Sequence, residues 1–93
     1  MSSPTAPSPT SPLTALVNVG PAVGRTFATI GLETVGDLAG RDPVEVFGAL
    51  CAAAGTDLDP CLLDTVRSAV DQADGEPARP WWTYSAERKA ASR

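Results

Sequence analysis

Apolar residues recur at helical spacing through the middle of the chain and predict a series of short helices. Residues 13–17, LTALV, form a brief first helix. In the second helix Val23, Phe27 and Ile30 follow one another at spacings of four and three residues, which places them on one face. The longest apolar stripe comes later in the chain and contains Leu62, Leu63, Val66, Ala69, Val70 and Ala73.

Start signals support three further helices. Asp42-Pro43 and Asp59-Pro60 each place an N-capping carboxylate before a proline that suits the first helical position. Thr34 and Asp37 have the spacing of a capping box and predict a shorter helix. We expect the helix after Asp42-Pro43 to bury one face, and the helix after Asp59-Pro60 to carry Arg67 and Asp71 on its outer side. The expected buried face consists of Val44, Phe47, Leu50, Cys51 and Ala54.

These patterns predict an all-α fold, a compact bundle of about five short helices over residues 13–75, because no segment alternates apolar and polar residues as a strand does. Residues 1–12 contain four prolines, four serines and two threonines without a charge, so they are predicted to be a disordered tail. Residues 76–93 form a Trp-rich, mildly basic C-terminal segment that is expected to pack on this small domain.

Composition excludes several classes of function. The 93 residues include no histidine, so Ser-His-Asp and Cys-His catalytic sites are absent and an enzyme is not expected. A metal site is not predicted, since two cysteines are too few soft ligands. No cofactor is predicted either. The chain lacks a secretory signal and a long apolar run, which predicts a cytoplasmic protein without a membrane partner.

Charge is unevenly distributed along the chain, whose net charge is −4. Residues 32–75 carry nine acidic residues and two arginines, whereas residues 13–31 carry only Arg25. A dedicated nucleic-acid-binding protein usually has a clear basic face, which this pattern does not predict.

The segment LVNVGPAVGRTFATIGLETVGDL, residues 16–38, resembles a helix-hairpin-helix motif. The usual Gly-apolar-Gly hairpin is replaced by Asn18-Val19-Gly20, and asparagine tolerates a positive φ better than other residues with a side chain. Val19 is expected to point inward, and Gly24 to allow a close helix crossing. The resemblance implies phosphate binding by a helix N-terminus, with Arg25 as the nearby cation. The implied N–H donors are those of Gly20, Ala22, Val23 and Gly24. The alternative is that the hairpin serves only to pack the helices.

A wider resemblance extends over residues 13–90. The order of the hairpin, the DPCLLD motif and the PARPWWTYSAERK segment resembles small bacterial proteins of the pathogenicity-locus or mitomycin-resistance-like family. This resemblance implies a compact, SAM-domain-like bundle built around one helix-hairpin-helix motif. It implies little about activity.

The C-terminal segment places Trp81, Trp82 and Tyr84 between basic residues. Because bases can stack on the aromatic rings and phosphates can pair with the basic side chains, the segment could be a second, weaker nucleic-acid surface. Its residues would be Arg79, Trp81, Trp82, Arg88 and Lys89. Alternatively the two tryptophans fold back to cover the small core, with their indole N–H groups bonded to the backbone. Ser85 is expected to cap a final helical turn.

Cys51 and Cys61 form a candidate redox pair, because a thiol near the helix start at Asp59-Pro60 is expected to have a lowered pKa. The alternative is that both cysteines are small buried apolar residues.

Three functions remain open on this basis. The first is weak, non-sequence-specific binding of the DNA or RNA backbone through the hairpin. The second is a protein-interaction adaptor or homodimer that has lost the phosphate site. The third is a drug-sequestering resistance protein that stacks a planar compound on Trp81 or Trp82.

Overall fold

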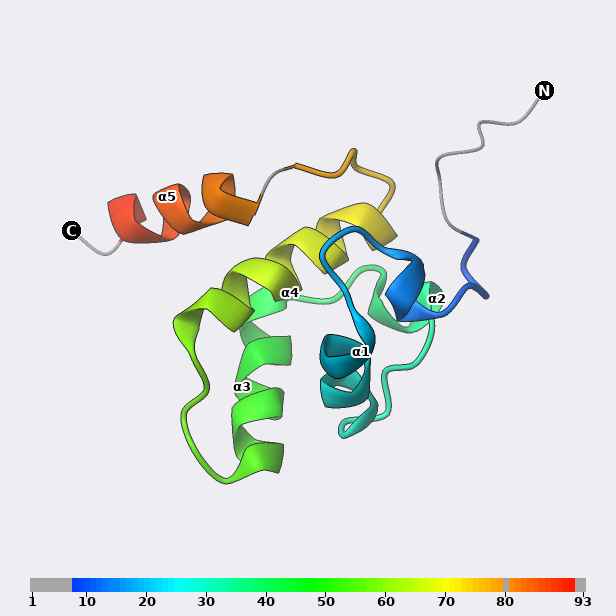
Figure 1. Cartoon of the computed structure of the whole chain (residues 1–93), viewed down its shortest axis with the longest axis horizontal. Coiled ribbons are helices and arrows are strands. Elements are labelled where there is room, and N and C mark those ends of the chain that lie inside the picture. The colour runs from blue at the N-terminus through cyan, green and yellow to red at the C-terminus, as the bar shows by residue number, and fades with distance from the viewer. Residues whose placement is uncertain (1–7, 80, 92–93) are drawn as a thin grey trace.

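The computed structural model describes residues 8–79 and 81–91, and in these residues the fold is all-α, as predicted (Figure 1). A single isolated bridge joins Pro12 to Thr34, and no strand is present in the described part. The elements in chain order are the 3₁₀ turn η1 (Leu13–Ala15), α1 (Pro21–Ala28), α2 (Val35–Leu38), α3 (Pro43–Ala54), α4 (Pro60–Ala73) and α5 (Trp81–Ala91).

Local start signals place the first residues of α3 and α4 as predicted. The carboxylate of Asp42 accepts a hydrogen bond from the N–H of Val44 at 2.9 Å, and Asp59 accepts one from Cys61 at 2.9 Å. Each carboxylate therefore satisfies an N–H group that the helix itself leaves unpaired.

The predicted capping box at α2 is also formed. Thr34 Oγ1 accepts from the N–H of Asp37 at 3.3 Å, and the Asp37 carboxylate accepts from the N–H groups of Glu33 and Thr34. Because both donors favour the charged carboxylate, the pKa of Asp37 lies below its ordinary value.

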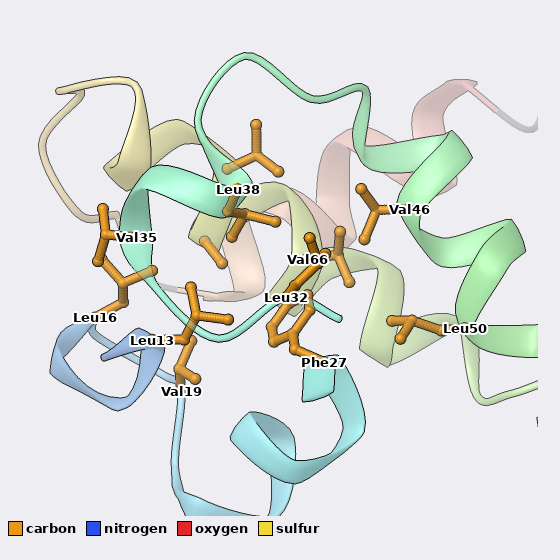
Figure 2. Packing of buried hydrophobic residues seen from close by; sticks show 12 residues of the cluster. Leu13, Leu16, Val19, Phe27, Leu32, Val35, Leu38, Val46, Leu50 and Val66 are labelled. Atoms are coloured by element: carbon orange, nitrogen blue, oxygen red, sulfur yellow. The ribbon is translucent and has the colours of Figure 1, made fainter. Parts of the chain in front are cut away.

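The hydrophobic core lies between η1, α1, α2, α3 and α4 (Figure 2). Phe27 from α1 is fully buried and meets core side chains from the other helices, with Leu38 and Val66 equally buried. The core cluster consists of Leu13, Leu16, Val19, Phe27, Leu32, Val35, Leu38, Val46, Leu50, Val66, Ala69 and Val70. Among the α5 side chains that the structure describes, Tyr84 is buried but none belongs to this cluster, whose members all precede the C-terminal helix.

The predicted face of α3 is only partly correct: Leu50 is buried and Phe47 and Cys51 are half-buried, but the two ends of the predicted stripe are not. Val44 is 64 % exposed and Ala54 is exposed, whereas Val46 and Leu50 are the buried residues of the helix. Apolar residues lie on several sides of α3, so periodicity alone cannot select the side that meets α4.

Residues 8–12, assigned to the disordered tail by composition, are held against α2. Gly36 donates its N–H to the carbonyl of Pro9 at 2.8 Å, and Val35 donates to Ser11 at 3.0 Å. These carbonyl groups accept hydrogen bonds from the first N–H groups of α2. Composition does not reveal such contacts, because the partners are distant in sequence. The rest of the predicted tail, residues 1–7, lies outside the described residues.

The C-terminal helix α5 is longer than the single turn predicted at Ser85, and it packs against α4. As a result, Arg67 and Asp71 face α5 and are half-buried, whereas the prediction placed them on an outer, solvated side. Asp71 accepts a hydrogen bond from the Tyr84 hydroxyl at 2.7 Å, and Arg67 lies 3.5 Å from a Glu87 carboxylate oxygen.

Candidate nucleic-acid interface at the turn before α1

The turn that leads into α1 has the predicted backbone geometry. Asn18 has φ 71°, in the left-handed region that asparagine tolerates. Val19 points into the core and is buried, as expected. Gly20 follows with φ −88° and ψ −179°, an extended conformation open to any residue. The element before the turn is shorter than the helix predicted over residues 13–17, because only Leu13–Ala15 forms a 3₁₀ turn.

A buried glutamine holds this turn in place. The Gln72 side chain on α4 accepts a hydrogen bond from the Val17 N–H at 2.9 Å and donates to the Val17 carbonyl at 3.0 Å. It also donates to Ser68 Oγ, one helical turn away, at 3.0 Å. Sequence reasoning missed Gln72; the available signal was a serine and a glutamine four residues apart beside the apolar stripe of α4.

The N-terminus of α1 is open. Its N-cap residue, Gly20, provides no side-chain hydrogen bond. Within the described part of the chain, the N–H groups of Gly20, Ala22 and Val23 have no acceptor, and Gly20 and Ala22 are exposed. The fourth predicted donor is wrong: Gly24 donates its N–H to the carbonyl of Gly20 at 2.9 Å, which is the first hydrogen bond of the helix.

Gly24 nevertheless has its predicted packing role. A Cβ atom at this position would lie 3.0 Å from the Thr14 methyl carbon, so the small residue permits the close approach of η1 and α1. At Gly20 a Cβ would meet nothing within 4 Å, which means that the backbone beside the open amides is accessible to a ligand.

A shallow hollow of about 340 Å³ lies between η1 and α1, beside the open amides. Its lining is mostly apolar, with one cation, Arg25, and one carboxylate residue, Glu33, among the bordering residues. The residues that border it are Pro12, Leu13, Thr14, Pro21, Gly24, Arg25, Ala28 and Glu33.

The C-terminal residues do not join this site. Figure 1 shows α5 along α4, on the side away from α1. Tyr84 is buried against α4. Trp82 does not cover the core as the alternative for the tryptophans expected, because it is 60 % exposed. Trp82 and Lys89 are exposed, whereas the Trp81 side chain lies outside the described residues.

The arginines of the predicted C-terminal surface are engaged with carboxylates. Arg79 lies 3.1 Å from Glu87 and 4.1 Å above the centre of the Tyr84 ring. The hydrogen bond between Arg79 and Glu87 raises the pKa of the guanidinium and lowers the pKa of the carboxyl group. Arg88 lies 3.1 Å from the buried carboxylate of Asp64. These ion pairs reduce the positive charge that the segment can offer to a phosphate.

Both cysteines are free thiols. Cys51 Sγ accepts a hydrogen bond from the Leu58 N–H at 3.4 Å, and Cys61 is exposed at the start of α4. The hydrogen bond to Asp59, together with the charge of that carboxylate, raises the pKa of Cys61. The effect is opposite to the lowering expected at a helix N-terminus, because the capping carboxylate outweighs the helix dipole.

The described residues thus define a small all-helical domain with open backbone donors at one tight turn. A model of the family described as "Pathogenicity locus" (Cdd1) matches residues 8–90, and the chain belongs to this family. The chain is also 61 % identical over 79 residues to a protein named mitomycin resistance protein McrB from Streptomyces lavendulae. That alignment covers 85 % of this chain and 75 % of the relative.

No solved structure matches the chain. In the part of the chain that the structure describes, none of the helices combines the length and the apolar character needed to cross a membrane.

Proposed function

We propose that the chain is a non-enzymatic helix-hairpin-helix protein that binds the DNA or RNA backbone weakly and without sequence specificity. The hairpin consists of η1, the turn at Asn18-Val19-Gly20 and α1. The observation that carries the proposal is the open N-terminus of α1, where the N–H groups of the exposed residues Gly20 and Ala22 have no acceptor among the described residues. Unpaired amides and the positive end of a helix dipole are a suitable site for a phosphate oxygen.

The other helix starts described in the structure differ in a way that supports this choice. The carboxylates of Asp42 and Asp59 occupy the N-termini of α3 and α4, where they would repel a phosphate. The N-terminus of α2 is filled by Asp37, Thr34 and the carbonyl groups of residues 9 and 11. Among the starts of α1, α2, α3 and α4, the turn before α1 is therefore the one without a carboxylate or a capping side chain in place.

The charge distribution sets the expected strength of binding. Arg25 is the single charged residue between positions 13 and 31, so the hairpin is locally positive within a chain of net charge −4. Few cationic contacts release few counterions, which predicts low affinity and a shallow salt dependence.

Replacing Gly20 with leucine tests the proposal. The side chain would project into open space, so the fold should persist while the phosphate approach is blocked. We expect at least tenfold weaker binding of labelled DNA or RNA in a fluorescence anisotropy titration at low salt. Gly48→Leu is the matched control, because a Cβ at Gly48 in α3 also meets nothing within 4 Å.

Arg25→Gln should reduce the slope of log affinity against log salt by roughly one, as expected when one phosphate contact is lost. Binding by Gly20→Leu at the wild-type level would contradict the proposal, as would a wild-type affinity that does not change with salt.

The name of the Streptomyces lavendulae relative favours a second candidate function, resistance by sequestering a drug. Trp82 is 60 % exposed on α5 and offers a ring on which a planar compound could stack. Mitomycin should then quench the tryptophan fluorescence. Equilibrium dialysis should show that the protein binds mitomycin and that Trp82→Ala weakens this binding. Val44→Ala, a change at another exposed apolar position, should leave the binding unchanged. Equal retention by all three proteins, or none by the wild type, would exclude this candidate.

A further inference from the structure

We infer that the hollow between η1 and α1 receives an unpaired nucleobase, so that the preferred ligand is single-stranded nucleic acid or an unpaired end. This inference rests on the proposed backbone binding at α1 and specifies its substrate class.

The hollow and the open amides belong to the same part of the molecule. Pro21, Gly24 and Arg25 border the hollow, and Ala22 and Val23, whose N–H groups are open, lie between them in the chain. The hollow therefore begins at the first residue of α1, within reach of the sugar and base of a nucleotide whose phosphate binds at this helix start.

The lining of the hollow suits a base more than a second phosphate. Pro12, Leu13, Pro21 and Ala28 present apolar groups, and unpaired bases are held in other proteins by stacking against apolar and aromatic side chains. The volume, about 340 Å³, falls within the range of small-ligand sites, which begins at about 300 Å³.

The charges at the border support the same orientation. Arg25 attracts the phosphate that the amides hold, whereas the carboxylate of Glu33 disfavours another phosphate inside the hollow. Arg25 and Glu33 are the charged residues among those that border it, so the hollow as a whole favours a neutral ring.

A duplex is expected to bind this site less favourably than a single strand does. Its bases are stacked and paired, so it offers phosphates and sugars to the hairpin and leaves the hollow empty. Bringing one base out of the stack costs a few kcal/mol in general. A single strand avoids that cost, and the burial of its base adds to the phosphate contact.

Three ligands of equal length test the inference by anisotropy at one low salt concentration: a single strand, its duplex, and a strand with abasic sites. The abasic strand keeps the phosphates and removes the bases. We expect the single strand to bind the wild-type protein about tenfold more tightly than either of the other two.

Ala28→Leu fills the hollow from an exposed position of α1 more than one helical turn from the Ala22 N–H. It should reduce single-strand binding to the level of the duplex and leave duplex binding unchanged. Ala53→Leu, the same change at an exposed position of α3, should leave both unchanged.

The outcomes separate this inference from the proposed function. If single strand, duplex and abasic strand bind equally and Ala28→Leu has no effect, while Gly20→Leu abolishes binding, the hollow does not receive a base but backbone binding stands. If none of the ligands binds in a salt-dependent manner, the proposed function fails and the inference fails with it.

Discussion

Phe27→Ala is expected to lower the free energy of unfolding by about 3–5 kcal/mol, the usual cost of truncating a buried aromatic ring. Phe27 is 0 % exposed and belongs to the core cluster, and the residues around it come from several helices, so the cavity cannot close by the movement of one side chain. A loss of this size is a large fraction of the stability of a small domain, generally about 5–15 kcal/mol. Urea unfolding followed by far-UV circular dichroism measures it.

Val44→Ala is the control for this prediction, because Val44 is an apolar residue of α3 that is largely exposed. Its substitution should change the free energy of unfolding by no more than about 0.5 kcal/mol. If Phe27→Ala were as mild as Val44→Ala, the packing in Figure 2 would be incorrect.

Asp64→Ala is expected to release α5 from α4 before the core unfolds. The Asp64 carboxylate is 1 % exposed and accepts a hydrogen bond from the Ser85 hydroxyl at 2.6 Å, in addition to its contact with Arg88. Its removal leaves the buried Ser85 hydroxyl without that acceptor, which in general costs about 1–3 kcal/mol. None of the described α5 side chains belongs to the core cluster, so the cost falls on the contact between the two helices.

Tryptophan fluorescence provides a local probe for this release, because both tryptophans of the chain lie on α5. In Asp64→Ala the fluorescence transition in urea should precede the transition seen by circular dichroism, whereas in the wild type the two should coincide. Asp64→Asn keeps an acceptor for Ser85 but removes the charge opposite Arg88. The separation of its fluorescence and circular dichroism transitions should therefore be smaller than in Asp64→Ala and larger than in the wild type. Coincident transitions at the wild-type urea concentration in Asp64→Ala would contradict a polar attachment of α5.

The candidate site was predictable from sequence as far as its backbone was concerned. Asn18 has the expected positive φ, Val19 is buried as expected, and Ala22 and Val23 keep open amides. The donor expected from Gly24 is used inside the helix, a detail that depends on where α1 begins. The hydrogen bonds between Gln72 and the turn were not predictable, because Gln72 contacts a residue 55 positions earlier. The neighbouring hollow was not predictable either, because it requires η1 to lie against α1.

The amino-acid sequence by itself determined the helical class, the starts of α3 and α4, and the turn at Asn18. These features depend on interactions within a few residues: a carboxylate reaching an N–H two positions ahead, a proline at a first helical position, and a residue that tolerates a positive φ. Tertiary structure alone decided which side of α3 is buried, how residues 9 and 11 complete α2, and that Arg67 and Asp71 face α5. Each of these features depends on which distant segments of the chain meet. Local conformational preferences hardly distinguish the alternative arrangements, so packing and hydrogen bonding between helices select one.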